Sequence, residues 1–249
     1  MSIGIIVFGE VGTGKSTLCN TLISKVGAFK ESDDVDAETL ETIAKDGIYK
    51  GQKTHVIDTP GMGHSSSLDA SHLVEIAKHL KNDNKIQAIV MTFNYTCPRF
   101  EEREKSLLSI VRNAFPNSKW FKHIAFVHTN VYDCLPPEKK SKLKFNKRKE
   151  GWRKKMKQFF PEIKEDYINA IPQFFIDSIE ARKMSNDSTC QICELLAWAS
   201  MLKPLKEDLP EMSVPLGKPE IKKRIRYEPA PSIRIWHKGH KVFGIGKSG

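Results

Sequence analysis

The chain has 249 residues, 39% of them hydrophobic, and a formal net charge of +10. This length suits one α/β domain of about 200 residues with an appendage, and no run approaches the ~18–20 apolar residues that span a membrane. The residues after Met1 lead straight into a strand-like run and the five cysteines are scattered, so we expect a cytoplasmic protein without a signal peptide and with reduced thiols.

Strand-like and helix-like segments alternate along most of the chain. Apolar runs predict strands at residues 3–8, 42–49, 53–58, 86–92, 123–129 and 172–177. Helical patterns occur at residues 15–26, 71–82, 101–115, 138–160 and 188–202. This alternation predicts an α/β fold with three layers, a mostly parallel sheet and helices on both of its faces. The link between the second and third strands is too short for a crossover, so that pair is expected to be an antiparallel hairpin.

A glycine-rich loop follows the first strand. Residues 9–17 read GEVGTGKST, which is the pattern G-x-x-x-x-G-K-[ST] between a strand and a helix. The glycines let the backbone curl around an anion at a helix N-terminus, whose dipole favours negative charge. Lys15 would reach the β- and γ-phosphates of a nucleotide, and Ser16 would bind Mg²⁺. The expected phosphate-binding residues are Gly9, Gly12, Thr13, Gly14, Lys15, Ser16 and Thr17.

A polar, mainly acidic segment at residues 31–41 follows the first helix. In a nucleotide-dependent switch protein, such a segment supplies a threonine to Mg²⁺ and is ordered by the γ-phosphate. Thr39 and Thr42 both qualify. We favour Thr39 as the metal ligand, because Thr42 lies at the start of the next predicted strand.

The third strand ends in the sequence Asp58-Thr59-Pro60-Gly61. A D-x-x-G sequence at this point after a P-loop is where GTPases place a magnesium-linked aspartate and a glycine that senses the γ-phosphate. Asp58 would hold Mg²⁺ through water, and the amide of Gly61 would bond the γ-phosphate and be released after hydrolysis. The alternative is a strand that ends in an ordinary Pro-Gly turn.

Two strand ends are candidates for binding the base. Asn130 and Asp133 follow the fifth strand with N-x-x-D spacing, although Val131 stands where lysine is usual. A carboxylate can accept two hydrogen bonds from guanine, and adenine offers no such donor pair, so Asp133 would select guanine. Ser178, after the last strand, is expected in the loop that covers the base. An Asn/Asp turn without a ligand is the alternative for the first pair.

These motifs together resemble the immunity-associated nucleotide-binding GTPases, the GIMAP/IAN or avirulence-induced-gene type, which belong with the septin-like and chloroplast-import GTPases. The resemblance covers roughly residues 3–202 and rests on GKSTLCNTLI, DTPGM, AIVMTFNYTCPRFEEREKSLLSIV and FVHTNVYD. It implies a P-loop GTPase fold that binds GTP or GDP with Mg²⁺. The chain departs from the family at Asn130-Val131, where members more often have Arg-Lys or His-Gly, and at Ser178, where they often have Asn.

The resemblance also implies association across the nucleotide face when GTP is bound, as a homodimer or oligomer. An arginine after the fourth strand can then act on the partner's nucleotide, and Arg99 occupies that place. The catalytic candidates are thus Lys15, Gly61 and Arg99. The alternative for Arg99 is an exposed side chain at a helix start, paired with Glu101 or Glu102.

Met62 stands directly after the D-x-x-G sequence, where many small GTPases have a glutamine that orients water. We therefore expect slow, Mg²⁺-dependent hydrolysis of GTP. One alternative is a nucleotide-regulated scaffold with negligible turnover. Another is an ATP-using P-loop enzyme such as a kinase, which Asp133 opposes.

The positive charge lies mainly in two segments. Eleven Lys and Arg against two acids occur in residues 138–158, and nine against two in residues 218–247. The predicted domains are a G domain at residues 1–203 and a Pro-rich, basic, flexible tail at residues 204–249. Both basic segments could contact an acidic membrane surface peripherally. The alternatives for the helix are a plain solvated face, which we favour, and nucleic-acid binding, which we favour least.

Cys190 and Cys193 form a C-x-x-C pair on the last predicted helix. Zinc binding or redox chemistry would need a second pair or a histidine cluster nearby, and the sequence has neither there. We expect these side chains to pack as small hydrophobic groups.

Overall fold

A computed structural model of the chain describes residues 2–31, 41–62, 72, 76, 79, 80, 82–96, 105, 108, 109, 118–131, 145–182 and 186–208. The chain divides into two compact units, Met1–Pro219 and Glu220–Gly249. All described residues belong to the first unit, so the fold and the site below are those of that unit alone.

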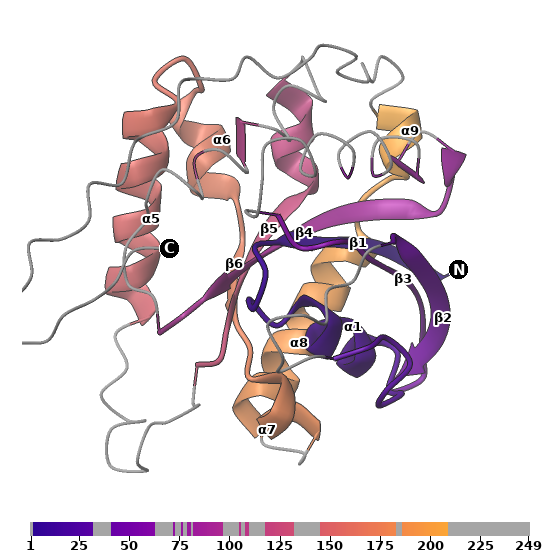
Figure 1. Cartoon of the computed structure of the whole chain (residues 1–249). Coiled ribbons are helices and arrows are strands. Elements are labelled where there is room, and N and C mark those ends of the chain that lie inside the picture. Colours follow the sequence, from indigo (N-terminus) through magenta and orange to yellow (C-terminus); the bar gives the residue numbers. More distant parts are fainter. Residues whose placement is uncertain are drawn as a thin grey trace, which may run out of the picture. The chain divides into compact units, whose positions relative to one another are not determined.

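The first unit is built on a sheet of six strands (Figure 1). Their bounds are β1 Ile3–Gly9, β2 Ile43–Tyr49, β3 Gln52–Asp58, β4 Ile86–Asn94, β5 Ile124–Thr129 and β6 Gln173–Phe175. The strand order is β2-β3-β1-β4-β5-β6. Only β2 and β3 pair in antiparallel fashion, and the other pairs are parallel. The predicted fold class, including the hairpin, is confirmed.

The helices of the described part are α1 Lys15–Leu22, α5 Phe145–Phe159, α6 Glu165–Ala170, α7 Ser178–Arg182, α8 Asn186–Ser200 and α9 Leu205–Asp208, with a 3₁₀ helix at Ser118–His123. Those residues of the predicted helices 71–82 and 101–115 that are described are helical. The first helix ends before the predicted residue 26, because Ser24 has a left-handed φ of 51°. The short α6 and α7 carry too few residues for a helical pattern and were not predicted.

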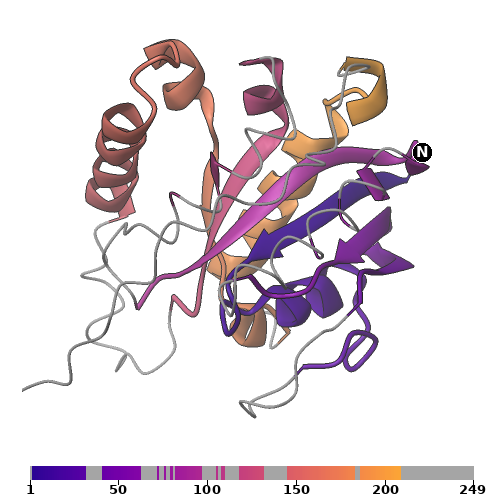
Figure 2. The same cartoon turned by 45° about the horizontal axis from the view of Figure 1, so that its top comes forward.

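Strands β1, β4 and β5 are buried on both faces, because their residues alternate between two hydrophobic cores, whereas β2 is mostly exposed. On β1, Ile6 and Phe8 join one core, and Ile5 and Val7 join the other. In Figures 1 and 2, α5, α6 and α9 cover the first face, and α1, α7 and α8 cover the second. The three-layer arrangement leaves the ends of the strands as the places where polar loops gather.

Two details differ from the sequence-based expectations. Leu205 is fully buried in the first core, so packed structure extends past residue 203, where the tail was predicted to begin. The prediction that Cys190 and Cys193 pack as small hydrophobic groups is wrong, because both are exposed. The polar outer face of α8 contains both, whereas Ile192 and Leu196 of the same helix are buried.

None of the helices in the described part of the chain has the length and apolar character that a membrane span requires. The same part of the chain contains no group of three or more His, Cys, Asp or Glu that could hold a metal ion.

Candidate nucleotide-binding site

The glycines of the P-loop stand where a side chain is disfavoured, at Gly12 and Gly14 by the backbone conformation and at Gly9 by lack of space. Gly12 and Gly14 have φ values of 74° and 75°, which L-amino acids with side chains rarely adopt. A Cβ on Gly9 would lie 2.1 Å from the hydroxyl oxygen of Thr92. The loop therefore turns tightly between β1 and α1 and passes directly over the end of β4.

Threonines fasten the loop to the neighbouring strands. The Thr13 hydroxyl lies 2.7 Å from the Thr92 hydroxyl on β4, and Thr92 donates to the Phe8 carbonyl at 3.0 Å. The hydroxyl of Thr129, the last residue of β5, donates to the Thr13 carbonyl at 2.7 Å. All three threonines are buried. Sequence reasoning predicted Thr13 but missed Thr92 and Thr129, and their only signal is a hydroxyl at the carboxyl end of an apolar strand.

Lys15 is the first residue of α1, and its side chain folds back over the loop. Its ammonium group donates to the Glu10 carbonyl at 2.8 Å, and only 6% of the residue is exposed. This bond curls the loop around its own lysine, so that the charge lies within the concave backbone. Such an arrangement can hold the phosphate groups of a nucleotide.

Ser16 and Asp58 meet under the loop. The Ser16 hydroxyl donates to Asp58 Oδ2 at 2.6 Å, and Asp58 is 1% exposed. Burial raises the pKa of Asp58, although Ser16 and Lys15 oppose that effect. The second carboxylate oxygen, Oδ1, is buried and has no hydrogen bond of ordinary geometry in the described part of the chain, although interactions with the Cys19 thiol and the Thr59 amide also act to lower the pKa of Asp58. A buried hydroxyl–carboxylate pair with an unsatisfied oxygen has the hard oxygen donors that Mg²⁺ takes from a protein.

The D-x-x-G segment lies against the P-loop. The Thr59 hydroxyl donates to the Val7 carbonyl at 2.8 Å, and the Met62 amide donates to the Gly9 carbonyl at 3.2 Å. Gly61 is buried beside Val11. Met62 is 4% exposed and belongs to the first core. Its side chain is thus a packing group, and it cannot hydrogen-bond a water molecule.

The predicted switch segment at residues 31–41, called the first switch segment below, lies between α1 and β2, and the residues on both sides of it are described. Asn20 of α1 holds the upstream end, because its amide group donates to the Phe29 carbonyl at 2.8 Å and accepts from the Phe29 amide at 2.7 Å. At the downstream end, Thr42 is buried directly before β2. Thr39, the favoured metal ligand, lies outside the described residues. Sequence reasoning missed Asn20, which is one of several polar residues of α1 that are buried.

The base-binding candidates lie at the ends of β5 and β6. Asn130 follows β5 with a left-handed φ of 54°, and its Oδ1 lies 3.8 Å from the point that a Cβ on Gly14 would occupy. Ser178 is the first residue of α7, and its buried hydroxyl has no hydrogen-bond partner among the described residues. The Ile176 amide donates to the His128 carbonyl at 2.9 Å, which holds these two strand ends side by side. Asp133 lies outside the described residues.

The segment that leaves β4 is held from two sides. The Tyr95 amide donates to the Thr129 carbonyl at 2.9 Å. The Arg148 guanidinium, on α5, donates to the Tyr95 carbonyl at 2.7 Å and lies 4.6 Å from the centre of its ring. Arg99 follows on this segment but lies outside the described residues.

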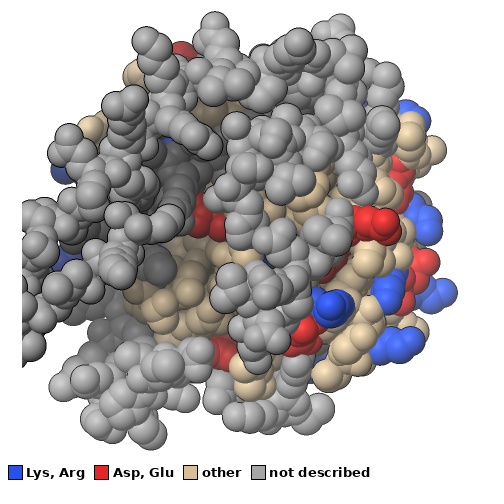
Figure 3. All heavy atoms as spheres, in the orientation of Figure 1, with Lys and Arg blue, Asp and Glu red and all other residues tan. Residues whose placement is uncertain are grey.

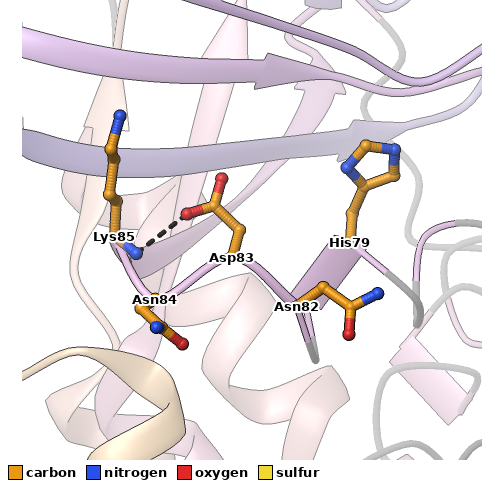
Figure 4. Close-up of a pocket in the computed structure, with 5 residues that line it drawn as sticks. All are labelled: His79, Asn82, Asp83, Asn84 and Lys85. Carbon is orange, nitrogen blue, oxygen red and sulfur yellow. Dashed lines mark hydrogen bonds between the residues drawn. The ribbon is translucent and has the colours of Figure 1, made fainter.

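A polar depression of about 490 Å³ lies elsewhere, beside the segment that leads into β4 (Figure 4). It is lined by His79, Asn82, Asp83, Asn84 and Lys85. Because β1 and β4 are parallel, this amino end of β4 is at the opposite edge of the sheet from the P-loop. The depression is therefore separate from the predicted nucleotide site.

The fold and the loops define the class of a P-loop nucleotide-binding protein of the GTPase type. The model of the AIG1 family matches residues 3–150, and the chain belongs to that family. The resemblance stated from the motifs is thereby confirmed.

Solved structures with the same fold come from Toc33 of Arabidopsis thaliana. Toc33 in complex with GDP and Mg²⁺ has a TM-score of 0.64 and 17% sequence identity, over 82% of this chain and 86% of that chain. A dimerization-deficient mutant of Toc33 has a TM-score of 0.65 at the same identity and coverage. At this identity the likeness establishes the fold.

A curated relative is the tRNA modification GTPase MnmE of Pseudothermotoga lettingae. It is 27% identical over 110 residues, which are 44% of this chain and 23% of that protein. The chain therefore matches less than a quarter of the length of this relative.

Proposed function

We propose that this protein is a guanine-nucleotide-binding switch that hydrolyses GTP slowly and with Mg²⁺. The observation that carries the proposal is the Ser16–Asp58 pair beneath the glycine loop, with its unsatisfied carboxylate oxygen. A P-loop that only packed two elements together would have no need for an unsatisfied, buried carboxylate oxygen beside its serine. The family and the Toc33 complex with GDP and Mg²⁺ support the same function.

In this proposal each described residue has a physical task. Backbone amides and Lys15 bind the phosphate groups, and the Thr13, Thr92 and Thr129 hydroxyls keep the loop in shape. Ser16 and Asp58 would hold Mg²⁺, with Thr39 or Thr42 from the first switch segment. The ion, when bound, neutralises charge on the β- and γ-phosphates. Gly61 would bond the γ-phosphate through its amide.

Guanine selection is assigned to Asp133 with Asn130 and Ser178. Asn130 lies beside Gly14 of the P-loop, so a nucleotide in the loop would have its base near the ends of β5 and β6. The neighbouring Toc33 structures contain GDP or GMPPNP, which agrees with a guanine site. A kinase-like ATP enzyme is the competitor that a binding experiment must address.

Slow turnover follows from the place of Met62. Because this side chain is buried in the core, the residue after the D-x-x-G sequence cannot position the attacking water. A group supplied by another molecule would then raise the rate, and Arg99 is our candidate in a second copy bound across the nucleotide face. For the neighbours atToc33 and psToc159, dimerization is described as important for GTPase activity.

The central experiment is a titration of the purified chain with fluorescent GDP, with unlabelled GTP and ATP as competitors, with and without Mg²⁺. We expect GTP to compete and ATP to fail, and EDTA to weaken binding. Competition by ATP at the same concentration as GTP would refute guanine selection. The absence of any nucleotide binding would refute the proposed function.

The rate and the role of Arg99 are tested by phosphate release over a range of protein concentrations. We expect activity per molecule to rise with concentration in the wild type and to stay at the basal level in Arg99→Ala. Full activity of Arg99→Ala would exclude the arginine in trans. No phosphate release at any concentration, with nucleotide still bound, would instead favour a nucleotide-regulated scaffold.

A further inference from the structure

Val11 of the P-loop lies in close contact with Gly61, the residue whose amide we propose bonds the γ-phosphate. It is the third residue of the P-loop, and 41% of it is exposed at the loop surface. A Cβ on Gly61 would lie 2.3 Å from Val11 Cγ2, 2.9 Å from its Cα and 3.0 Å from its backbone nitrogen. The Gly61 backbone therefore packs directly on Val11, and any side chain at position 61 would separate the two segments.

Backbone hydrogen bonds continue this contact. The Val11 amide donates to the Met62 carbonyl at 3.3 Å, and the Met62 amide donates to the Gly9 carbonyl at 3.2 Å. Glu10 and Met62 thus form a parallel bridge beyond the ends of β1 and β3. The buried side chain of Met62 anchors the same segment in the core. Gly61 is therefore positioned by two neighbours: Met62, which follows it in the chain and is anchored in the core, and Val11 of the P-loop.

We propose that Val11 is a positioning residue that holds Gly61 against the P-loop and thereby sets the preference for a nucleoside triphosphate over a diphosphate. This rests on the proposed function, in which the Gly61 amide bonds the γ-phosphate. Only a triphosphate has that group, so a loss of order at Gly61 weakens the triphosphate alone. The diphosphate depends on the loop amides and on Lys15 and Ser16, whose side chains are held by the Glu10 carbonyl and by Asp58 and not by the Val11 side chain.

Substitutions of the Val11 side chain can separate its contact with Gly61 from the backbone bridge between the P-loop and Met62. Val11→Gly removes the Cγ2 contact and adds backbone freedom at the third position of the loop, while the bridge to Met62 can still form. Val11→Thr keeps a branched side chain of nearly the same shape. The chain also offers a matched control, because Val26 is a valine with 71% exposure in the turn after α1.

The experiment measures the affinities of GDP and of a non-hydrolysable GTP analogue, with Mg²⁺, for the full chain and for Val11→Gly, Val11→Thr and Val26→Gly. For Val11→Gly we expect the analogue affinity to fall about three- to tenfold, the effect of losing one small apolar contact, and the GDP affinity to change less than about twofold. Val11→Thr and Val26→Gly should match the wild type in both. Thermal unfolding of each variant shows that it is folded.

A second arm uses Gly61→Ala, alone and with Val11→Gly. If the two residues act through one contact, the double variant loses no more analogue affinity than Gly61→Ala alone, whereas independent effects would add. An unchanged or tighter analogue affinity in Val11→Gly would overturn the inference, and tighter binding would mean that Val11 obstructs the γ-phosphate. If the wild type binds neither nucleotide, the proposed function fails, and this inference fails with it.

Discussion

The two edges of the sheet each contain a cluster of polar side chains around one buried residue, Asp58 or His55, and the clusters differ in how far the hydrogen-bonding capacity of that residue is satisfied. At the carboxyl edge, Asp58 bonds Ser16 through one oxygen and leaves the other without a partner in the described chain. At the amino edge, His55 lies between Asp46 at 2.6 Å and Asp83 at 2.7 Å, so both ring nitrogens are used. Since buried polar groups are nearly always hydrogen-bonded, the unsatisfied cluster is the one that indicates a ligand.

The amino-edge cluster has a structural role that its geometry explains. Asp46 is on β2, His55 is on β3 and Asp83 is in the turn before β4, so one imidazole ties three segments together. Each ring nitrogen of His55 lies within hydrogen-bond distance of one carboxylate oxygen. The bond to His55 lowers the pKa of Asp46. Histidine and aspartate residues often suggest a functional site in a sequence, but here they form a hydrogen-bonded structural link between three segments.

The largest predicted effect concerns His128, a histidine buried near the carboxyl end of β5. Burial lowers the pKa of His128 to about 3, despite a bond to Gln173. The unfolded chain takes up a proton near pH 6.5 and the folded chain does not, so stability is lost as pH falls from about 6.5 toward 3. The full loss is on the order of 5 kcal/mol.

Urea unfolding at several pH values, for the wild type and His128→Phe, checks this effect. The phenyl ring keeps the stacking on Phe175, whose ring centre is 4.7 Å from that of His128. We expect a flatter pH dependence in the variant between pH 7 and pH 4. Parallel curves for the two proteins would show that His128 is charged in the fold.

The second-largest effect is expected from Asp58→Asn, which changes the unsatisfied carboxylate at the carboxyl edge of the sheet. We expect the Mg²⁺-dependent affinity for a GTP analogue to fall on the order of 10- to 100-fold, as for groups that hold a metal through water. The raised pKa of Asp58 means that burying its charge costs stability above the ordinary pKa. The nucleotide-free variant should therefore unfold at the same temperature as the wild type or higher.

Thermal unfolding with and without nucleotide separates these two results. A clearly lower melting temperature of the nucleotide-free variant would contradict the comparison, because Asp58 would then be a structural carboxylate like Asp83. Ser16→Ala is the matched change on the other side of the pair, and it should weaken Mg²⁺-dependent binding in the same direction.

How far the site could be predicted depends on how local its contacts are. The P-loop was predictable because Gly12 and Gly14 serve a turn within nine consecutive residues. Thr92 and Thr129 were not, because their partners are far away in the chain and exist only once β1, β4 and β5 lie in register.

The same limit applies to the burial of single side chains on a helix. Cys190 and Cys193 follow an apolar pattern in sequence, yet the rotation of α8 places them outward, and that rotation is set by packing against the sheet. Strand positions were easier, because β1, β4 and β5 are buried on both faces and read as continuous apolar runs.

A smaller effect is expected from substitutions in the hydrogen-bonded cluster around His55 at the amino edge of the sheet. His55→Phe should reduce the free energy of unfolding by about 1–2 kcal/mol, because Asp83, whose side chain is only 20% exposed, loses its partner. Asp46→Asn should cost less than Asp83→Asn, since the side chain of Asp46 is 68% exposed. Denaturant unfolding gives the ranking. Nucleotide affinity should stay within about twofold of the wild type in all three variants, and a larger change would show that the two edges are coupled.

The smallest effect is expected from α5, whose basic side chains are mostly engaged within the protein. Arg148 bonds Tyr95, Arg153 bonds Asn169 and Lys157 pairs with Glu165. Lys149 lies over the ring of Phe175. Where β2 and β3 lie, the visible surface mixes positive and negative side chains (Figure 3). Membrane contact through residues 138–158 and the tail stays a prediction.

Vesicle flotation with anionic and neutral lipids distinguishes the two basic segments in the full chain. Charge reversal at the exposed Lys154 and Lys155 of α5 should weaken binding by at most about 1 kcal/mol per lysine. Reversal of Lys222 and Lys223 in the tail should weaken it more. Equal effects of the two charge reversals would support α5 as a membrane-binding face. Vesicle binding that is insensitive to salt would exclude an electrostatic membrane contact by either segment.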